Sequence, residues 1–103
     1  MIGVRFEWDE AKNRSNQRKH DGVSFEEAAR VFQDPLHVSV QDRFDGGEQR
    51  WQTVGTVERF MILVVAHTII EEDDDGGSIE IIRIISARRA TPRERRRYEN
   101  ENS

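Results

Sequence analysis

The chain has 103 residues, of which 35% are hydrophobic and 35% charged, with no cysteine and a formal net charge of −4. This length predicts a single domain over residues 1–103, and the missing cysteines exclude disulfide frameworks and thiolate metal sites. No apolar run approaches the length of a membrane span, and the first residues lack the pattern of a signal peptide. We therefore expect a small soluble domain of the cytoplasm with no membrane segment.

The first predicted helix covers residues 10–20. Asp9 is a suitable N-cap, and Gly22 suits the left-handed conformation that ends a helix. The helix has almost no apolar stripe of its own. We expect it to dock through Trp8, Ala11 and the methylene stems of its long side chains.

A second helix follows, and its pattern is clearer. Ser24 and Glu27 form a capping box at its start, and the Asp34-Pro35 pair ends it. Its apolar side chains recur at helical spacing, at Phe25, Ala28, Ala29 and Phe32.

The rest of the chain predicts four strands and a last helix. The expected segments are a strand over 36–40, a turn over 42–49, a hairpin of strands 50–58 and 60–70, an acidic loop over 71–78, and a strand over 79–87. Thr91, Pro92 and Glu94 then open the C-terminal helix as N-cap, first helical residue and capping-box partner. The order predicts an α+β fold in which two N-terminal helices and a C-terminal helix pack on a four-stranded antiparallel sheet.

The charges are unevenly distributed along the chain. Acids fill residues 71–75, whereas residues 12–20 contain bases and no acid, and arginines crowd residues 88–97. Arg88 and Arg89 stand where a central strand leads into a capped helix, and two planar guanidinium forks there suit phosphate oxygens. The arginines of the helix itself, among them Arg95, are also compatible with a simple solvated face.

Two further positions could extend a basic site. Arg83 lies among isoleucines and needs an anion or a carboxylate partner if it is buried. Arg50 and Trp51 begin a strand and could add a cation and a stacking surface for a nucleic-acid base.

Metal chemistry finds little support in the residue pattern. Residues 71–76 match the start of a calcium loop, but Ile82 stands where that loop requires a bidentate glutamate. The three histidines lack the spacing of zinc ligands. His37 is expected to be exposed and His67 to be a hydrogen-bonded core residue, whereas His20 could equally be a helix C-cap or an active-site group.

The chain resembles the BrnT family of bacterial toxins, which are RelE-like ribonucleases of type II toxin–antitoxin modules. The resemblance is carried by FEWDEAKNRSNQRKH and GVSFEEAARVFQDPL near the start, RWQTVG in the middle, and IRIISARRATPRERRRYE near the end. It implies a small RelE-like domain that cleaves RNA and inhibits translation without a metal or other cofactor. It also implies a BrnA-type ribbon-helix-helix antitoxin as partner, which itself binds operator DNA.

The resemblance assigns roles to the basic residues. His20 and Glu94 become candidates for proton transfer, and Arg50, Arg88 and Arg89 for clamping the reacting phosphate. The implied RNA-binding residues are Lys19, Trp51, Arg83 and Arg95.

The chain departs from the family pattern in two places. Asp21 lengthens the turn after His20, and the acidic residues 71–78 replace a tight turn that carries an arginine. Because no single residue stands out as a general base, a basic module that binds nucleic acid or a protein partner without chemistry is the competing interpretation.

Overall fold

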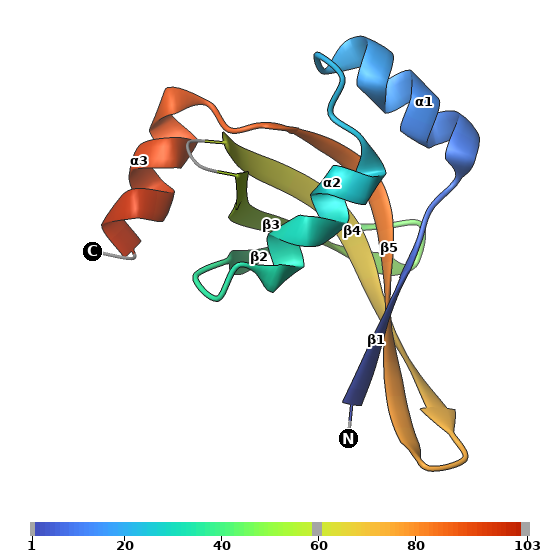
Figure 1. Ribbon diagram of the computed structural model, residues 1–103. Coiled ribbons are helices and arrows are strands. Elements are labelled where there is room, and N and C mark those ends of the chain that lie inside the picture. Colours follow the sequence, from blue (N-terminus) through green and yellow to red (C-terminus); the bar gives the residue numbers. More distant parts are fainter. Residues whose placement is uncertain (1, 59–60, 102–103) are drawn as a thin grey trace.

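The computed structural model describes residues 2–58 and 61–101, and Figure 1 shows its helices and strands. The elements in chain order are β1 (Ile2–Glu7), α1 (Glu10–Lys19), α2 (Phe25–Ala29), the 3-10 helix η1 (Arg30–Gln33), β2 (Val38–Asp45), β3 (Glu48–Glu58), β4 (Met61–Asp74), β5 (Gly77–Arg89) and α3 (Pro92–Glu101). The α+β class expected from the sequence is confirmed.

The sheet differs from the expected one by an additional strand. The segment before α1 was not predicted as a strand, but it forms β1, which runs parallel to β5 at one edge of a five-stranded mixed sheet of order β1-β5-β4-β3-β2. The other neighbouring strands are antiparallel. The six residues of β1 form a strand by pairing with a segment of β5 more than seventy positions away. The local sequence therefore could not predict this strand.

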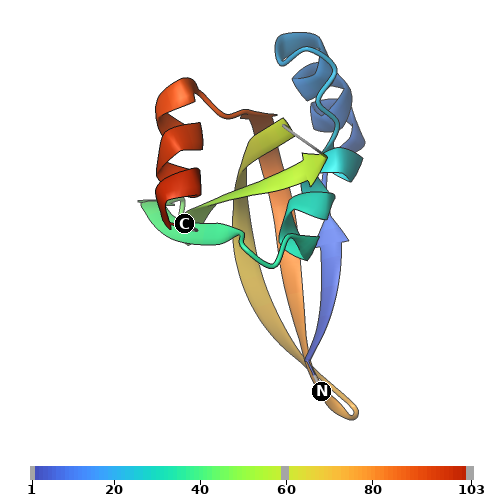
Figure 2. The same cartoon turned by 60° about the vertical axis from the view of Figure 1, so that its left-hand side comes forward.

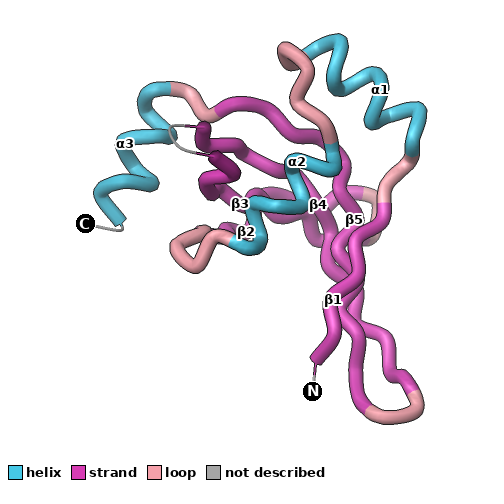
Figure 3. Tube along the Cα trace, viewed as in Figure 1, coloured by secondary structure: helices cyan, strands magenta, loops and turns pink. Residues whose placement is uncertain are grey.

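Two segments predicted as turn or loop are largely strand. Only Gly46 and Gly47, both with positive φ, turn the chain in the region 42–49. The acidic residues 71–74 continue β4 and pair with the first residues of β5, so that β4 and β5 form a long arm beyond β2 and β3, along which β1 also pairs with β5 (Figures 1 and 3). Backbone pairing with β5 outweighs the low strand propensity of these acids, because charged side chains on the arm remain in water. The turn of this hairpin was predicted at Glu58 and Arg59, and residues 59 and 60, the second of which was predicted to begin the next strand, lie outside the described residues.

The helices lie on opposite faces of the sheet. α1 and α2 lie on one side of the strands and α3 on the other (Figure 2). We name these sides the α1/α2 face and the α3 face. The hydrophobic core fills the α1/α2 face and includes the fully buried Phe25, Val31, Leu63 and Val65. The second predicted helix is shorter than expected, because η1 replaces its last turn before Asp34.

Helix α1 docks through amides rather than through the residues predicted for it. Trp8 does pack its ring against Phe25, but Ala11 is exposed. Asn16 donates to the carbonyls of Val23 and Ala87 at 2.9 and 2.8 Å and accepts from the backbone N–H of Ala87 at 3.1 Å. Since β1 pairs with β5 only as far as Arg83, this amide completes the hydrogen bonding of the β5 edge where β1 has ended.

A second asparagine one turn earlier joins α1 to α2. Asn13 is 1% exposed and accepts a 2.8 Å hydrogen bond from the backbone N–H of Phe25, the first residue of α2. Its amide nitrogen donates to Glu10 and Glu26. The first N–H groups of a helix have no partner within the helix, so Asn13 satisfies a group that burial would otherwise leave unpaired.

Helix α3 has no buried residue, and Glu94 and Tyr98, one turn apart, are among the side chains that attach it. Glu94 receives a bidentate ion pair from Arg88, and the hydroxyl of Tyr98 donates to the buried carboxylate of Asp34. Burial raises the pKa of Asp34, but hydrogen bonds from Tyr98 and from the backbone of Thr56 and Leu36 outweigh it and hold that pKa below its usual value. Burial and Asp34 together raise the pKa of Tyr98 to about 12.

The prediction that His67 is a hydrogen-bonded core residue agrees with the structure. Its side chain is fully buried, its Nε2 lies 2.6 Å from the hydroxyl of Thr53, and Phe32 meets its ring edge-on. Burial lowers the pKa of His67 to about 4, so the ring is neutral at physiological pH. His67 is therefore a neutral, hydrogen-bonded residue of the core.

Candidate functional site: a cationic cleft between α1 and the end of β5

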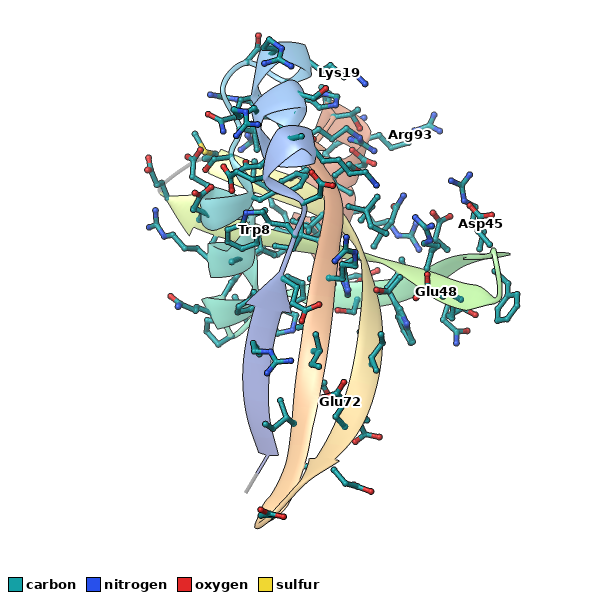
Figure 4. All side chains as sticks on the ribbon, turned by 90° about the vertical axis from the view of Figure 1, so that its right-hand side faces the viewer. Trp8, Lys19, Asp45, Glu48, Glu72 and Arg93 are labelled. Atoms are coloured by element: carbon teal, nitrogen blue, oxygen red, sulfur yellow. The ribbon has the colours of Figure 1, made fainter. Side chains whose placement is uncertain are left out.

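A cleft of about 300 Å³ opens where the end of α1 meets the exit of β5. Its lining residues are Lys19, His20, Asp21, Arg88, Arg89 and Thr91. The adjoining cleft, of about 250 Å³, shares Lys19 and His20 and adds Lys12 on the side of α1. Lys19 and Arg93 mark this end of the molecule in Figure 4, opposite the end of the arm. Residues seventy positions apart in the chain thus form one basic site.

Arg88 is the most rigidly held cation of this cleft. Its Nη1 and Nη2 lie 2.7 and 2.9 Å from the two carboxylate oxygens of Glu94, a fork-to-fork geometry that fixes the guanidinium plane. The hydrogen bonds from Arg88 lower the pKa of Glu94 to about 2, and the same contact raises the pKa of Arg88. Both groups are therefore charged at any physiological pH.

Glu94 is also fixed by the start of its own helix. It accepts from the backbone N–H of Thr91 at 2.9 Å, and the Thr91 hydroxyl accepts from the Glu94 N–H at 3.2 Å, which is the predicted capping box. A carboxylate with a pKa near 2 is a weak proton acceptor. The geometry favours a role in orienting Arg88 over a role in proton transfer.

The sequence left open whether His20 is a helix C-cap or an active-site group, and its position in the structure is compatible with both. It is the C-cap of α1, where its backbone N–H donates to the carbonyl of Asn16 at 2.9 Å, and its half-buried side chain lines the cleft. The next residue, Asp21, has φ +53, the left-handed region that L residues rarely adopt, and Gly22 follows with φ +83. The additional residue thus extends the turn and leaves His20 at the cleft.

Other predicted site residues lie elsewhere. Trp51 is paired with His67, points to the α1/α2 face and is not among the residues that line the cleft. Arg50 and Arg83 lie on the α3 face, several residues along their strands from the position of Arg88. Arg95 is half-buried on α3. Of the predicted set, the structure brings together only Lys19, His20, Arg88 and Arg89, with Glu94 joined through Arg88.

Sequence reasoning missed two residues of this site. Thr91 and Asp21 line the cleft, although the pattern identified Thr91 only as a helix cap and Asp21 only as part of a turn. Thr91 is two residues after Arg89, and Asp21 directly follows His20. This closeness in the sequence to predicted site residues could have identified both. Asp21 adds a carboxylate to an otherwise cationic wall.

Two further properties concern the residues that the structure describes. Among them, no group of three or more His, Cys, Asp or Glu side chains is arranged so that it could hold a metal ion. None of the described helices has the length and apolar character needed to cross a membrane.

The fold and cleft define a class of protein, a small α+β domain with a largely cationic cleft at the end of a central strand. Comparisons with known proteins show to which family this domain belongs. Residues 8–94 match the family model described as "Ribonuclease toxin, BrnT, of type II toxin-antitoxin system", and the chain belongs to this family.

A solved structure shows the same fold. The crystal structure of the Brucella abortus ribonuclease toxin BrnT aligns over 88% of this chain and 97% of its own, with a TM-score of 0.57 and 22% sequence identity. None of the curated proteins compared with the chain matches it. The family resemblance seen in the sequence is thereby confirmed.

Proposed function

We propose that the chain is a metal-independent endoribonuclease whose active site is the cleft between α1 and the end of β5. The observation that carries the proposal is the meeting of Lys19, His20, Arg88 and Arg89 in one cleft. Fixed cations stabilise the charge that builds on phosphorus during phosphodiester cleavage, and an imidazole transfers protons near neutral pH.

The cleavage uses the 2′-hydroxyl of the RNA itself. His20 takes the proton of the 2′-OH, the resulting oxygen attacks the adjacent phosphorus, the bond to the 5′ oxygen of the next nucleotide breaks, and a water molecule gives this leaving oxygen its proton. The products are a 2′,3′-cyclic phosphate and a 5′-hydroxyl end. A positioned general base contributes roughly 10²- to 10⁴-fold to such a step.

The arginines bind the phosphate oxygens in this proposal. Glu94 engages Nη1 and Nη2 of Arg88, and a guanidinium has further N–H donors that remain for the substrate. Because Glu94 also fixes the plane of the fork, Arg88 is preorganised, which lowers the entropic cost of binding the transition state. Arg89 is exposed and supplies a second, more adaptable cation.

The test is RNA cleavage by the purified chain in the presence of EDTA. Cleavage should continue, and the products should carry 2′,3′-cyclic phosphate. Arg88→Ala and Arg89→Ala should each lower kcat/KM by about 100-fold or more, as loss of one oxyanion donor does, whereas Arg96→Ala on the exposed side of α3 should lower it by less than about threefold. RNA binding without cleavage would support instead the competing interpretation as a non-catalytic module.

The partner in this proposal is an acidic segment of a BrnA-type antitoxin, which would also connect the toxin to operator DNA. Such a segment would cover the cleft, and charge pairs of this kind raise the association rate and set orientation. Expression of the chain alone in the bacterial cytoplasm should arrest growth by stopping translation, and co-expressed antitoxin should restore growth. A saturated toxin–antitoxin complex that cleaves RNA at the free rate would show that the antitoxin does not cover the cleft.

A further inference from the structure

A second cluster of hydrogen-bond donors lies on the α3 face, apart from the cleft. Thr68 on β4 pairs directly with Arg83 on β5. On the other side of β4, the pairing with β3 ends at Trp51 opposite His67; Arg50 and Thr68 are the next residues of the two strands, and because successive side chains alternate between faces, both point away from the face of Trp51 and His67. Side chains directly opposite in adjacent strands point to the same face. Arg50, Thr68 and Arg83 therefore form one row across three strands.

The row contains buried polar atoms that have no partner. Thr68 is 3% exposed, and both its Oγ1 and the Nε of Arg50 are inaccessible to solvent and make no hydrogen bond to any described residue. Leaving a buried donor unsatisfied costs about 1 to 3 kcal/mol. Buried polar atoms of this kind call for a partner that the chain does not supply, such as a bound water, an ion or a ligand, and the two arginines favour an anion here.

The nearby carboxylates do not satisfy these arginines. The closest are Asp45, at 3.9 Å from Arg50, and Glu7, at 3.9 Å from Arg83. Both contacts are longer than hydrogen bonds, and each carboxylate belongs to a side chain that is about half exposed. Such pairs contribute little stability and can be exchanged for a better anion.

We propose that Arg50, Thr68 and Arg83 form a second phosphate subsite, which holds an RNA phosphate several nucleotides from the one in the cleft. The two guanidinium groups, which are more exposed than Thr68, would meet the phosphate oxygens, and the Thr68 hydroxyl would become accessible as a further donor when the arginine side chains move onto the ligand. This inference rests on the proposed ribonuclease function, because the subsite would bind another part of the same RNA substrate.

The spacing of the two sites fits one strand of RNA. Arg83 and Arg88 are five residues apart but point to the same face of β5, because a bulge opposite Ala66 and His67 adds one residue between them, and they are separated by roughly 13 to 16 Å along the strand. Single-stranded RNA bound along β5 would thus reach from the cleft to the row. The acidic arm beyond the row carries Glu72, which Figure 4 places further from Lys19, so like-charge repulsion would end the path there.

Binding of a noncleavable probe tests the subsite independently of catalysis. The probe is a fully 2′-O-methylated RNA of ten nucleotides, which lacks the attacking hydroxyl. Thr68→Val removes only the hydroxyl and should weaken binding about tenfold. Arg83→Gln should weaken binding and reduce the salt dependence of log K by about 0.7, the value for one phosphate contact on a single strand.

Three controls make the result specific. Thr68→Ser retains the hydroxyl and should bind within about twofold of wild type. Arg97→Gln removes a highly exposed arginine of α3 and should leave both affinity and salt slope unchanged. Thermal unfolding verifies that each variant is folded, and the exposed Arg83 is the position that tests the subsite even if the buried Thr68→Val variant unfolds.

The outcomes separate the subsite from the proposed activity. Wild-type affinity and salt slope in Thr68→Val and Arg83→Gln, or a wild-type chain that does not bind the probe, would overturn the subsite. Cleavage of a dinucleotide by the wild-type chain reports on the cleft alone. Its failure, together with the expected losses of probe binding, would contradict the ribonuclease proposal and leave the subsite supported.

Discussion

Helices α1 and α3 have similarly few apolar residues but attach to the sheet by different chemistry. α1 buries the amides of Asn13 and Asn16, which complete the backbone hydrogen bonds of α2 and β5. α3 buries no residue and depends on Glu94 and Tyr98, which bind the ionisable partners Arg88 and Asp34. The comparison shows that a polar helix can be integral to the core when its amides satisfy backbone groups. A helix held through ionisable side chains remains sensitive to pH.

The largest effect is expected at Asn16. Asn16→Ala would leave the backbone N–H and carbonyl of Ala87 and the carbonyl of Val23 buried without a partner. At about 1 to 3 kcal/mol for each unsatisfied group, the free energy of unfolding should fall by about 3 to 5 kcal/mol. Urea unfolding followed by circular dichroism measures this.

Arg18→Ala is the matched control, since it changes an exposed side chain of the same helix. It should alter the free energy of unfolding by less than about 0.5 kcal/mol. If Asn16→Ala were no more destabilising than this control, the amides would not be what attaches α1.

An intermediate, pH-dependent effect is expected at Glu94. Its pKa is about 2 in the folded chain against a usual value of 4.5, so the folded state binds fewer protons than the unfolded state between these values. The stabilisation by Glu94 is therefore fully present above pH 4.5 and is lost as the pH falls through 2. With solvent screening at a side chain that is 29% exposed, it amounts to about 1 to 2 kcal/mol.

Glu94→Gln provides the comparison, because glutamine retains an acceptor for the capping box but has no charge. Wild type should be more stable than this variant at pH 7, and the two should converge towards pH 2. Asp34 is present in both proteins, so its own titration cancels in the difference. A stability difference that does not change with pH would exclude the Arg88 ion pair as the attachment of α3.

The smallest effect is expected at Tyr98. Tyr98→Phe removes the hydrogen bond to Asp34, but the backbone N–H groups of Thr56 and Leu36 still satisfy this carboxylate. Loss of one hydrogen bond to a charged group with other donors in place should cost about 1 kcal/mol. Hydrogen exchange should accelerate at the amides of α3 and not at those of α1. Equal acceleration in both helices would mean that they unfold as one unit.

The sequence by itself determined the features that are set by near neighbours. Caps, turn residues and helical spacing located α1, the start of α2 and the start of α3, because each depends on contacts within about one turn of the chain. The burial of His67 followed from the apolar strand around it. The sequence also identified Arg88 and Arg89 as candidates, because a strand that leads into a capped helix places two consecutive arginines at a sheet end.

Only the tertiary structure decided what depends on distant partners. β1 exists because it pairs with β5, the acidic residues 71–74 are extended because β5 runs beside them, and Asn16 is buried because β1 ends early. The sequence also could not predict that Arg88 lies at the cleft while Arg50 and Arg83 lie elsewhere on the sheet. A shift of one residue in the strand register changes the face to which a side chain points. That register places Arg88 beside Glu94 at the cleft and puts Arg50 in one row with Thr68 and Arg83.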